Sequence, residues 1–476
     1  MTDRTETVPG SVGAKAESRA RLTFKEKVGY GLGDMASNLY FQTFVLFLPI
    51  FYTDVFGISA AAMGTMMLVT RIWDAVTDPL MGVVADRTQT RWGKFRPYIA
   101  GFAIPLAIAG VLTFTTPGFG TTGKLVYAYI TYMLLMTLYT IVNVPYSALM
   151  GVITPNSMER TEVSSYRFVA AFVGQFIVGA ATLGLVEYLG RGDEAFGWQM
   201  TMVIYGLLAA ALLFATFALT KERVLPEKEK RNKIKEDLKD LFRNKPWVLA
   251  GAATLFQLTY IVMRGSSTTY YFRYFVGDQQ LTIAGTMIDL GYALFASSFI
   301  TAGTIATLAG AVLTNYFTKW MDKKSVYSWF LISSALFSSA FFFLDPEHVL
   351  LMYILNVLVS FFFGAVSVTQ WAIYTDTADF GEWKFGRRAT ALIMAASLFA
   401  LKLGLTFGGA IVGWVLEFHG FVPLATQSES AITGIRLLMS FYPAIFGLIG
   451  GVIMIFYPLK DSFMAQIETE LAARKR

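Results

Sequence analysis

The sequence Arg71-Ile-Trp-Asp74-Ala-Val-Thr-Asp78-Pro79 lies inside a long apolar run and leads into the basic turn Asp86-Arg87-Thr-Gln-Thr-Arg91-Trp-Gly-Lys94-Phe-Arg96-Pro97. A carboxylate at the centre of a membrane helix costs about 2.5 to 3.5 kcal/mol, so an acidic pair there indicates a functional site. On a helix with about 3.6 residues per turn, positions 74 and 78 differ in direction by about 40°. Two negative charges on one helix face favour a cation between them.

The composition of the chain is typical of an integral membrane protein. Of the 476 residues, 55% are hydrophobic, 15% are charged and 41 are Phe. There is no Cys, which excludes disulfides and thiolate metal sites. Residues 1–28 are polar and contain no apolar run of the signal-peptide kind, so we expect a cytosolic tail.

The apolar runs between charged turns predict an all-α integral membrane fold with about twelve spans, each of about 20 residues or more. Two pseudo-symmetric six-helix halves with a site between them are a transporter architecture. We expect the spans near residues 29–55, 59–85, 96–116, 123–152, 160–189, 196–220, 247–276, 290–318, 325–345, 348–374, 388–418 and 434–458.

Lys and Arg gather in alternate connections, and this predicts the orientation. The N-terminal tail, the 86–96 turn and the turns at 319–324 and 384–388 are basic, as is a long charged linker. By the positive-inside rule these segments and both termini face the cytosol, so the net charge of +6 requires no nucleic acid partner. The expected order is tail, half, linker, half and tail, at residues 1–28, 29–220, 221–245, 246–459 and 460–476.

Two long motifs carry a resemblance to a known family. The first runs from Asp78 through Asp86-Arg87 to Pro97, and the second is Asp376-Thr-Ala-Asp379-Phe-Gly-Glu382-Trp-Lys384-Phe-Gly-Arg387-Arg388. Together they resemble the glycoside-pentoside-hexuronide:cation symporters, a branch of the major facilitator superfamily, over residues 23 to 460. The resemblance implies a secondary transporter in the plasma membrane, which is the inner membrane in a bacterium, that moves a sugar or glycoside together with a cation.

The resemblance also assigns site residues. Asp74, Asp78 and Thr140 match the family's cation site, whereas Thr77 stands where melibiose permease has Asn. Asn38 and Asn143 replace two sugar-binding aspartates of that permease, and Ser147 replaces its Trp, so a galactoside is not implied. Arg71, Arg167 and Lys402 match charged residues that face the central cavity.

A cation site at this place is also supported without the family. Pro79 and Pro145 have no amide hydrogen and therefore free the carbonyls of Ala75 and Ile141. Carboxylate, hydroxyl and carbonyl oxygens suit a small hard cation such as Na⁺ or Li⁺. H⁺ is the alternative, because one Asp of a close pair has a raised pKa and can carry a proton. Asp74 could instead pair with Arg71 as a buried brace, but this leaves Asp78 without a partner.

The remaining polar positions in the spans suggest the substrate. Asn38 and Asn143, together with Arg167 and Lys402, make the expected cavity positive, which suits a hexuronide; Asn amides suit a neutral xyloside or glycoside equally. An interdomain salt bridge is the other interpretation of Arg167 and Lys402. Four further candidates have an alternative structural role: Asp34, Arg264, Tyr139 and Trp371.

The cytosolic motifs suggest a gate. Charge-assisted contacts at the inner mouth can form in one access state and break in the other. The alternative is that these charges only set the topology. The candidate gating residues are Arg87, Arg91, Lys94, Asp379, Glu382 and Arg388.

Other chemistries lack support. His348 and His419 both fall in expected external turns, so neither a His-based proton relay nor a His metal cluster is supported. No phosphate-binding loop or nucleophile turn is present, so we expect neither an enzyme nor an organic cofactor. The alternatives are a sodium-coupled lysolipid carrier, an uncoupled sugar facilitator and, less favoured, a membrane enzyme. The expected partners are a sugar, a monovalent cation and the lipid bilayer, and we expect a monomer.

Overall fold

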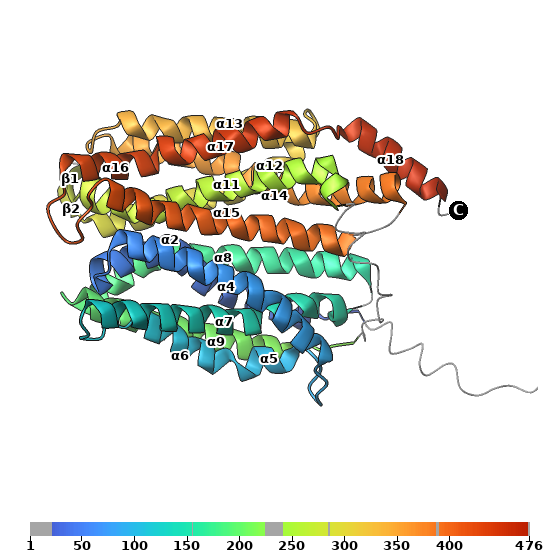
Figure 1. Ribbon diagram of the computed structural model, residues 1–476, viewed down its shortest axis with the longest axis horizontal. Coiled ribbons are helices and arrows are strands. Elements are labelled where there is room, and N and C mark those ends of the chain that lie inside the picture. Colours follow the sequence, from blue (N-terminus) through green and yellow to red (C-terminus); the bar gives the residue numbers. More distant parts are fainter. Residues whose placement is uncertain (1–20, 155, 224–240, 284–285, 387–389, 475–476) are drawn as a thin grey trace, which may run out of the picture.

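Two helical bundles lie one above the other in the computed structural model (Figure 1), which describes residues 21–154, 156–223, 241–283, 286–386 and 390–474. The lower bundle, here called the N-bundle, comes from the first part of the chain. Its elements are α2 (Phe24–Leu46), α3 (Leu48–Ile50), η1 (Phe51–Phe56), α4 (Ala60–Arg87), α5 (Arg96–Gly101), α6 (Ala103–Thr113), α7 (Thr121–Ile153), α8 (Ser157–Gly190) and α9 (Glu194–Leu219).

The upper bundle, here called the C-bundle, follows the linker. Its elements are α11 (Lys245–Tyr270), η2 (Tyr271–Val276), α12 (Tyr292–Phe317), α13 (Lys323–Ser339), η3 (Ala340–Phe343), α14 (Val349–Phe385), α15 (Thr390–Phe418), α16 (Glu429–Met439) and α17 (Phe441–Ile455).

The helical membrane fold predicted from the sequence is confirmed. Within the described residues, nine helices are long and apolar enough to cross a membrane, and the pair Phe24–Leu46 and Leu48–Phe56, bent by 55°, raises this to as many as ten. The 28-residue α4 is not among them, because charged side chains interrupt its apolar sequence. The expected span at 96–116 is broken at Phe102 into two short helices, α5 and α6.

The structure differs from the sequence expectations in two connecting segments. An external turn was expected after residue 276, but β1 (Gln279–Ile283) and β2 (Thr286–Leu290) pair there as an antiparallel hairpin. The C-terminal tail forms a further helix, α18 (Asp461–Arg474), because Met464, Ile467 and Leu471 bury their side chains against the C-bundle.

The two bundles meet most closely where α4 crosses α15. A Cβ atom on Gly413 would lie 2.4 Å from the carbonyl oxygen of Ala60, and one on Gly64 would lie 2.6 Å from that of Ala410. Only glycine permits this approach. The crossing lies near the start of α4 and the end of α15, the ends that we predict to face outward.

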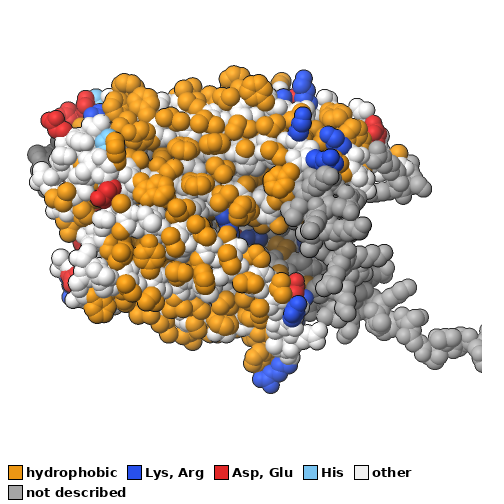
Figure 2. All heavy atoms as spheres, viewed as in Figure 1, with side chains coloured by type: hydrophobic (Ala, Val, Ile, Leu, Met, Phe, Trp, Pro, Cys, Tyr) orange, Lys and Arg blue, Asp and Glu red, His pale blue; other side chains and the backbone are white. Residues whose placement is uncertain are grey.

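A recess lies between the bundles away from this crossing. Figure 2 shows an apolar outer surface, as a membrane protein requires, and a recess between the bundles in which Lys and Arg side chains are visible. The recess lies toward the end from which α18 extends, the end that we predict to be cytosolic. The fold therefore places a polar chamber between two bundles.

Candidate functional site

Two carboxylates of α4 meet a hydroxyl of α7 at the centre of the N-bundle. Thr140 Oγ1 lies 3.0 Å from Asp74 Oδ1 and 2.9 Å from Asp78 Oδ1. Asp74 and Thr140 are each only 3% exposed. A hydroxyl has a single hydrogen and can donate it to one carboxylate at a time, so three oxygen atoms converge there with one proton between them.

A cation from the C-bundle reaches the same oxygens. Lys402 on α15 forms an ion pair with Asp78, and its Nζ lies 3.5 Å from Asp74 Oδ2. Arg71 Nη1, one turn before Asp74, lies 3.6 Å from the same Oδ2. The two carboxylates and two basic groups balance in charge, and the Lys402 ammonium crosses the boundary between the bundles to do so.

Helix irregularities surround these ligands. Pro79 lies inside α4 and Pro145 lies inside α7, and each removes one backbone donor from its helix. Thr77 does not point at the carboxylates, because its Oγ1 donates to the backbone carbonyl of Asp74 at 3.3 Å. Thr77 therefore shapes the local helix in this conformation.

A second polar group lies on α2, α7 and α8. Asn38 Nδ2 donates to the carbonyl of Asp34, while its Oδ1 accepts from Gln175 Nε2 at 3.1 Å. Asn143 Oδ1 accepts from the Ser37 hydroxyl at 3.4 Å. Sequence reasoning missed Gln175 and Ser37, because neutral polar side chains are common in membrane helices and carry no distinct pattern.

Arg167 is balanced by Asp34. The Nε of Arg167 lies 3.2 Å from Asp34 Oδ1, and its guanidinium lies 5.7 Å from the Tyr146 ring centroid. With Lys402 paired to Asp78, the chamber between the bundles is close to electrically neutral. This removes the reason for expecting a positive cavity.

The three other residues that the sequence suggested for substrate binding each lie in a different environment. Tyr139 is half-buried against the apolar core of the N-bundle. Trp371 on α14 packs edge-on against Tyr374 and remains 40% exposed. Arg264 is enclosed within the C-bundle beside Asn356.

The basic turn after α4 is held within the N-bundle. Lys94 Nζ pairs with Asp86 at 2.9 Å, and the carboxylate of Glu222 accepts the backbone N–H groups of residues 94–96. Arg91 stacks on Trp92, with 4.5 Å from its guanidinium to the ring centroid, and Arg87 is exposed.

The second motif lies at the end of α14. Asp376 pairs with Lys323 at 2.5 Å, inside the C-bundle. Asp379 and Glu382 are half-buried nearby on the same helix. Arg388 lies outside the described residues. A gating role for these residues stays a prediction.

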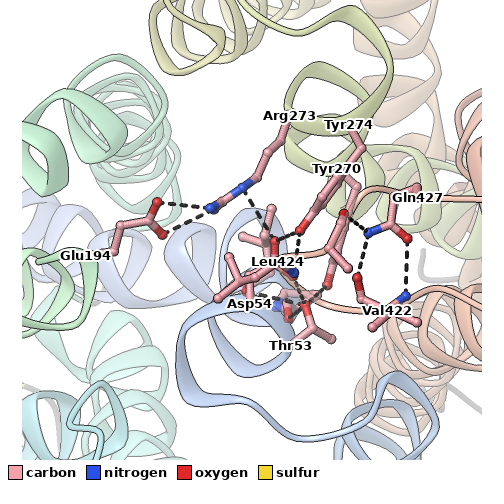
Figure 3. A network of polar contacts seen from close by, with 12 residues as sticks. Thr53, Asp54, Glu194, Tyr270, Arg273, Tyr274, Val422, Leu424 and Gln427 are labelled. Carbon is pink, nitrogen blue, oxygen red and sulfur yellow. Dashed lines mark hydrogen bonds and ion pairs between the residues drawn. The ribbon is translucent and has the colours of Figure 1, made fainter. Parts of the chain in front are cut away.

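A network that the sequence did not predict joins the bundles at the opposite end (Figure 3). Arg273 on η2 donates from both Nη atoms to Glu194, at 3.0 and 3.2 Å, and its Nε lies 3.6 Å from Asp54 Oδ2. Tyr274 also donates to Asp54, which is only 2% exposed. Asp54 and Glu194 belong to the N-bundle, so Arg273 fastens one bundle to the other.

The hydroxyls of Thr53 and Tyr270 extend this network. We define the outer network as Thr53, Asp54, Glu194, Tyr270, Arg273 and Tyr274. Thr53 Oγ1 and Tyr270 Oη lie 2.7 Å apart across the bundle boundary. The backbone N–H of Leu424 donates to Tyr274 Oη at 3.2 Å. None of these six residues was a candidate from the sequence alone.

Comparison with known proteins finds transport proteins that match nearly the whole chain. Residues 29–461 match the family described as MFS/sugar transport protein. Inner membrane symporter YicJ of Escherichia coli (strain K12) is 36% identical over 457 residues, and the match covers 96% of each chain. The isoprimeverose transporter of Lactiplantibacillus pentosus is 33% identical, with 98% of this chain and 96% of that protein covered.

A further relative and a solved structure complete the comparison. The glucuronide carrier protein homolog of Escherichia coli (strain K12) is 31% identical, with 96% of this chain and 97% of that protein covered. The crystal structure of a mutant of the nucleoside transporter NupG superposes with a TM-score of 0.63 at 13% identity, covering 90% of this chain and 99% of that one. The NupG likeness shows a shared fold.

Proposed function

This chain belongs to the glycoside-pentoside-hexuronide:cation symporters of the major facilitator superfamily, and we propose that it carries a neutral glycoside together with Na⁺. It is a multi-pass protein of the plasma membrane and a transporter rather than an enzyme. One observation carries the proposal: the Lys402 ammonium pairs with both carboxylates of an acidic pair that shares the Thr140 hydroxyl.

The proposed coupling is a competition between two cations. Na⁺ at Asp74, Asp78 and Thr140 uses the oxygens that Lys402 contacts, so the ion and the ammonium repel each other. Because Lys402 belongs to α15, its release changes the attraction between the bundles. Occupation of the site thereby biases the balance between access states, and linkage requires the sugar to favour Na⁺ binding in return.

The proposed sugar contacts are neutral. Asn38, Asn143, Gln175 and Ser37 offer amide and hydroxyl groups suited to sugar hydroxyls, and Asp34 already neutralises Arg167. A hexuronide would bring an uncompensated negative charge into this chamber, at a desolvation cost that no unpaired basic group among the described residues of the chamber offsets. The balance of charge therefore favours a pentoside or other neutral glycoside.

Binding of a sugar panel to the purified protein tests this proposal. We expect a neutral xyloside or related disaccharide to bind about 5- to 150-fold more tightly in Na⁺ than in choline at equal ionic strength, the usual range of a coupling free energy. Li⁺ and pH series distinguish the alternative cations. A glucuronide that binds more tightly than its neutral glucoside would overturn the neutral-substrate proposal, and affinity indifferent to every cation would overturn the coupling.

We further propose that the outer network closes the external side in this conformation. Arg273→Gln removes the bridge to Asp54 and Glu194, so the outer ends should separate more often. Since the chain has no Cys, a single Met67→Cys, buried against Gly409 of α15, can report the opening. We expect labelling by an impermeant maleimide added from outside to accelerate by about tenfold or more.

Arg191→Gln provides the matched control, because Arg191 is an exposed arginine in the turn before Glu194. It should leave the labelling rate unchanged. Equal labelling rates in Arg273→Gln and in the parent would show that the outer network does not hold the bundles together.

A further inference from the structure

Arg264 is a buried cation that the proposed transport mechanism does not use. It lies on α11 and is only 4% exposed. Its Nη1 donates to Asn356 Oδ1 at 3.1 Å, whereas Nε and Nη2 have no acceptor among the residues that the structure describes. A guanidinium stays protonated in proteins, so it cannot relieve the cost of burial by losing its proton.

The groups around Arg264 do not balance its charge. Its guanidinium lies 4.9 Å from the ring centroid of Phe341 and 5.6 Å from that of Phe299. Asn356 is fixed by its own Nδ2, which donates to the carbonyl of Phe299 at 2.7 Å and leaves its oxygen toward Arg264. Aromatic faces attract the charge but accept nothing from the N–H groups at the guanidinium edge. No carboxylate forms an ion pair with Arg264 in the described part of the chain.

Other enclosed arginines of this protein find strong acceptors. Arg436 donates from Nη2 to the carbonyls of Phe342 and Leu344, at 2.6 and 3.3 Å. Arg273 and Arg167 each pair with carboxylates. Arg436 also leaves its Nε without a partner among the described residues, but it has two carbonyl acceptors where Arg264 has a single amide oxygen. Arg264 is therefore the least satisfied of these four arginines, and an unpaired charge in a membrane interior is among the most costly features a fold can contain.

We propose that the Nε–Nη2 edge of Arg264 binds a small monovalent anion, namely chloride. The two N–H groups on that edge of a guanidinium point in parallel and chelate one acceptor. A single negative charge completes the pair, and a compact halide needs less room than an oxyanion beside a guanidinium that the rings of Phe299 and Phe341 already enclose. The site lies inside the C-bundle, apart from the acidic pair, so it is a constitutive partner of the fold rather than a transported ion.

The first test compares thermal unfolding of the purified full chain in sodium chloride and in sodium methanesulfonate, at the same Na⁺ concentration. We expect chloride to raise the unfolding midpoint by a few degrees in a saturable manner. Arg264→Met, which keeps an unbranched apolar side chain and removes the charge, should lose the chloride effect. Arg243→Met, at an exposed arginine on the surface, should retain it.

A second measurement does not depend on a variant that must fold. Crystals of the unchanged protein grown in sodium bromide should show anomalous density beside Nε and Nη2 of Arg264. Equal stability in the two salts, a chloride effect that survives in Arg264→Met, or bromide density absent from that edge would each overturn the proposal. Protection by sodium glucuronate but not by chloride would also overturn it, because it would assign Arg264 to the substrate.

Discussion

Asp78→Asn is expected to abolish cation-dependent sugar binding while leaving the protein folded. Asp78 shares the Thr140 hydroxyl with Asp74 and pairs with Lys402, and its side chain keeps some contact with solvent. The amide retains the shape but removes one of the two negative charges that hold the ion. We expect the Na⁺ affinity, measured by calorimetry on the purified protein, to fall on the order of 100-fold.

The control for this loss is Asp345→Asn. Asp345 is an exposed carboxylate near His348, far along the chain from the acidic pair, and its removal should leave Na⁺ affinity unchanged. If Asp78→Asn and Asp74→Asn both bind Na⁺ as the parent does and still couple it to sugar, the acidic pair is only a structural brace for Arg71 and Lys402.

Gly413→Leu is expected to reduce transport to near background without removing sugar binding. Even a Cβ atom at this position would lie 2.4 Å from the carbonyl of Ala60 and 2.8 Å from Gly64 Cα. Both obstacles are backbone atoms, which cannot turn aside as a flexible side chain can. The outer crossing of α4 and α15 must therefore open, and the protein should be held with its external side accessible.

Uptake into cells and spin-label distances between the outer ends of α4 and α15 measure this effect. We expect the distance distribution to shift to longer values, with Gly413→Ala intermediate. Gly184→Leu is the matched control, because this helical glycine of α8 has no neighbouring atom within 4 Å of an added Cβ. Uptake at the parent rate in Gly413→Leu would show that the glycine crossing is not needed for alternating access.

Much of the fold could be predicted because its signals are local. Long apolar runs specify membrane helices, and the positions of Asp74 and Asp78 on one helix face follow from helix geometry alone. The continuation of α14 to Phe385 could not be predicted in this way, because residues 375–385 are polar and their helix is stabilised by packing. The same holds for α18, whose apolar side chains rest on the C-bundle.

The same distinction between local signals and long-range packing applies to the functional sites. The acidic pair is visible in the sequence because charge in apolar surroundings is rare and costly. By contrast, the pairing of Arg167 with Asp34 removed the expected positive charge of the cavity, although both residues were identified as candidates. Which opposite charges meet depends on the distance between helices, and no property of either residue reveals it.

The amino-acid sequence by itself determined that this chain is a helical membrane transporter of its family, with an acidic pair on one helix face, because hydropathy and helical period are properties of short segments. Only the tertiary structure decided that Lys402 pairs with both carboxylates, that Arg273 fastens the bundles at the end opposite the recess, and that Arg264 has no counter-charge in the described part of the chain. The physical reason is that electrostatic energy depends on separations of a few ångströms between side chains hundreds of residues apart, which are fixed by helix packing.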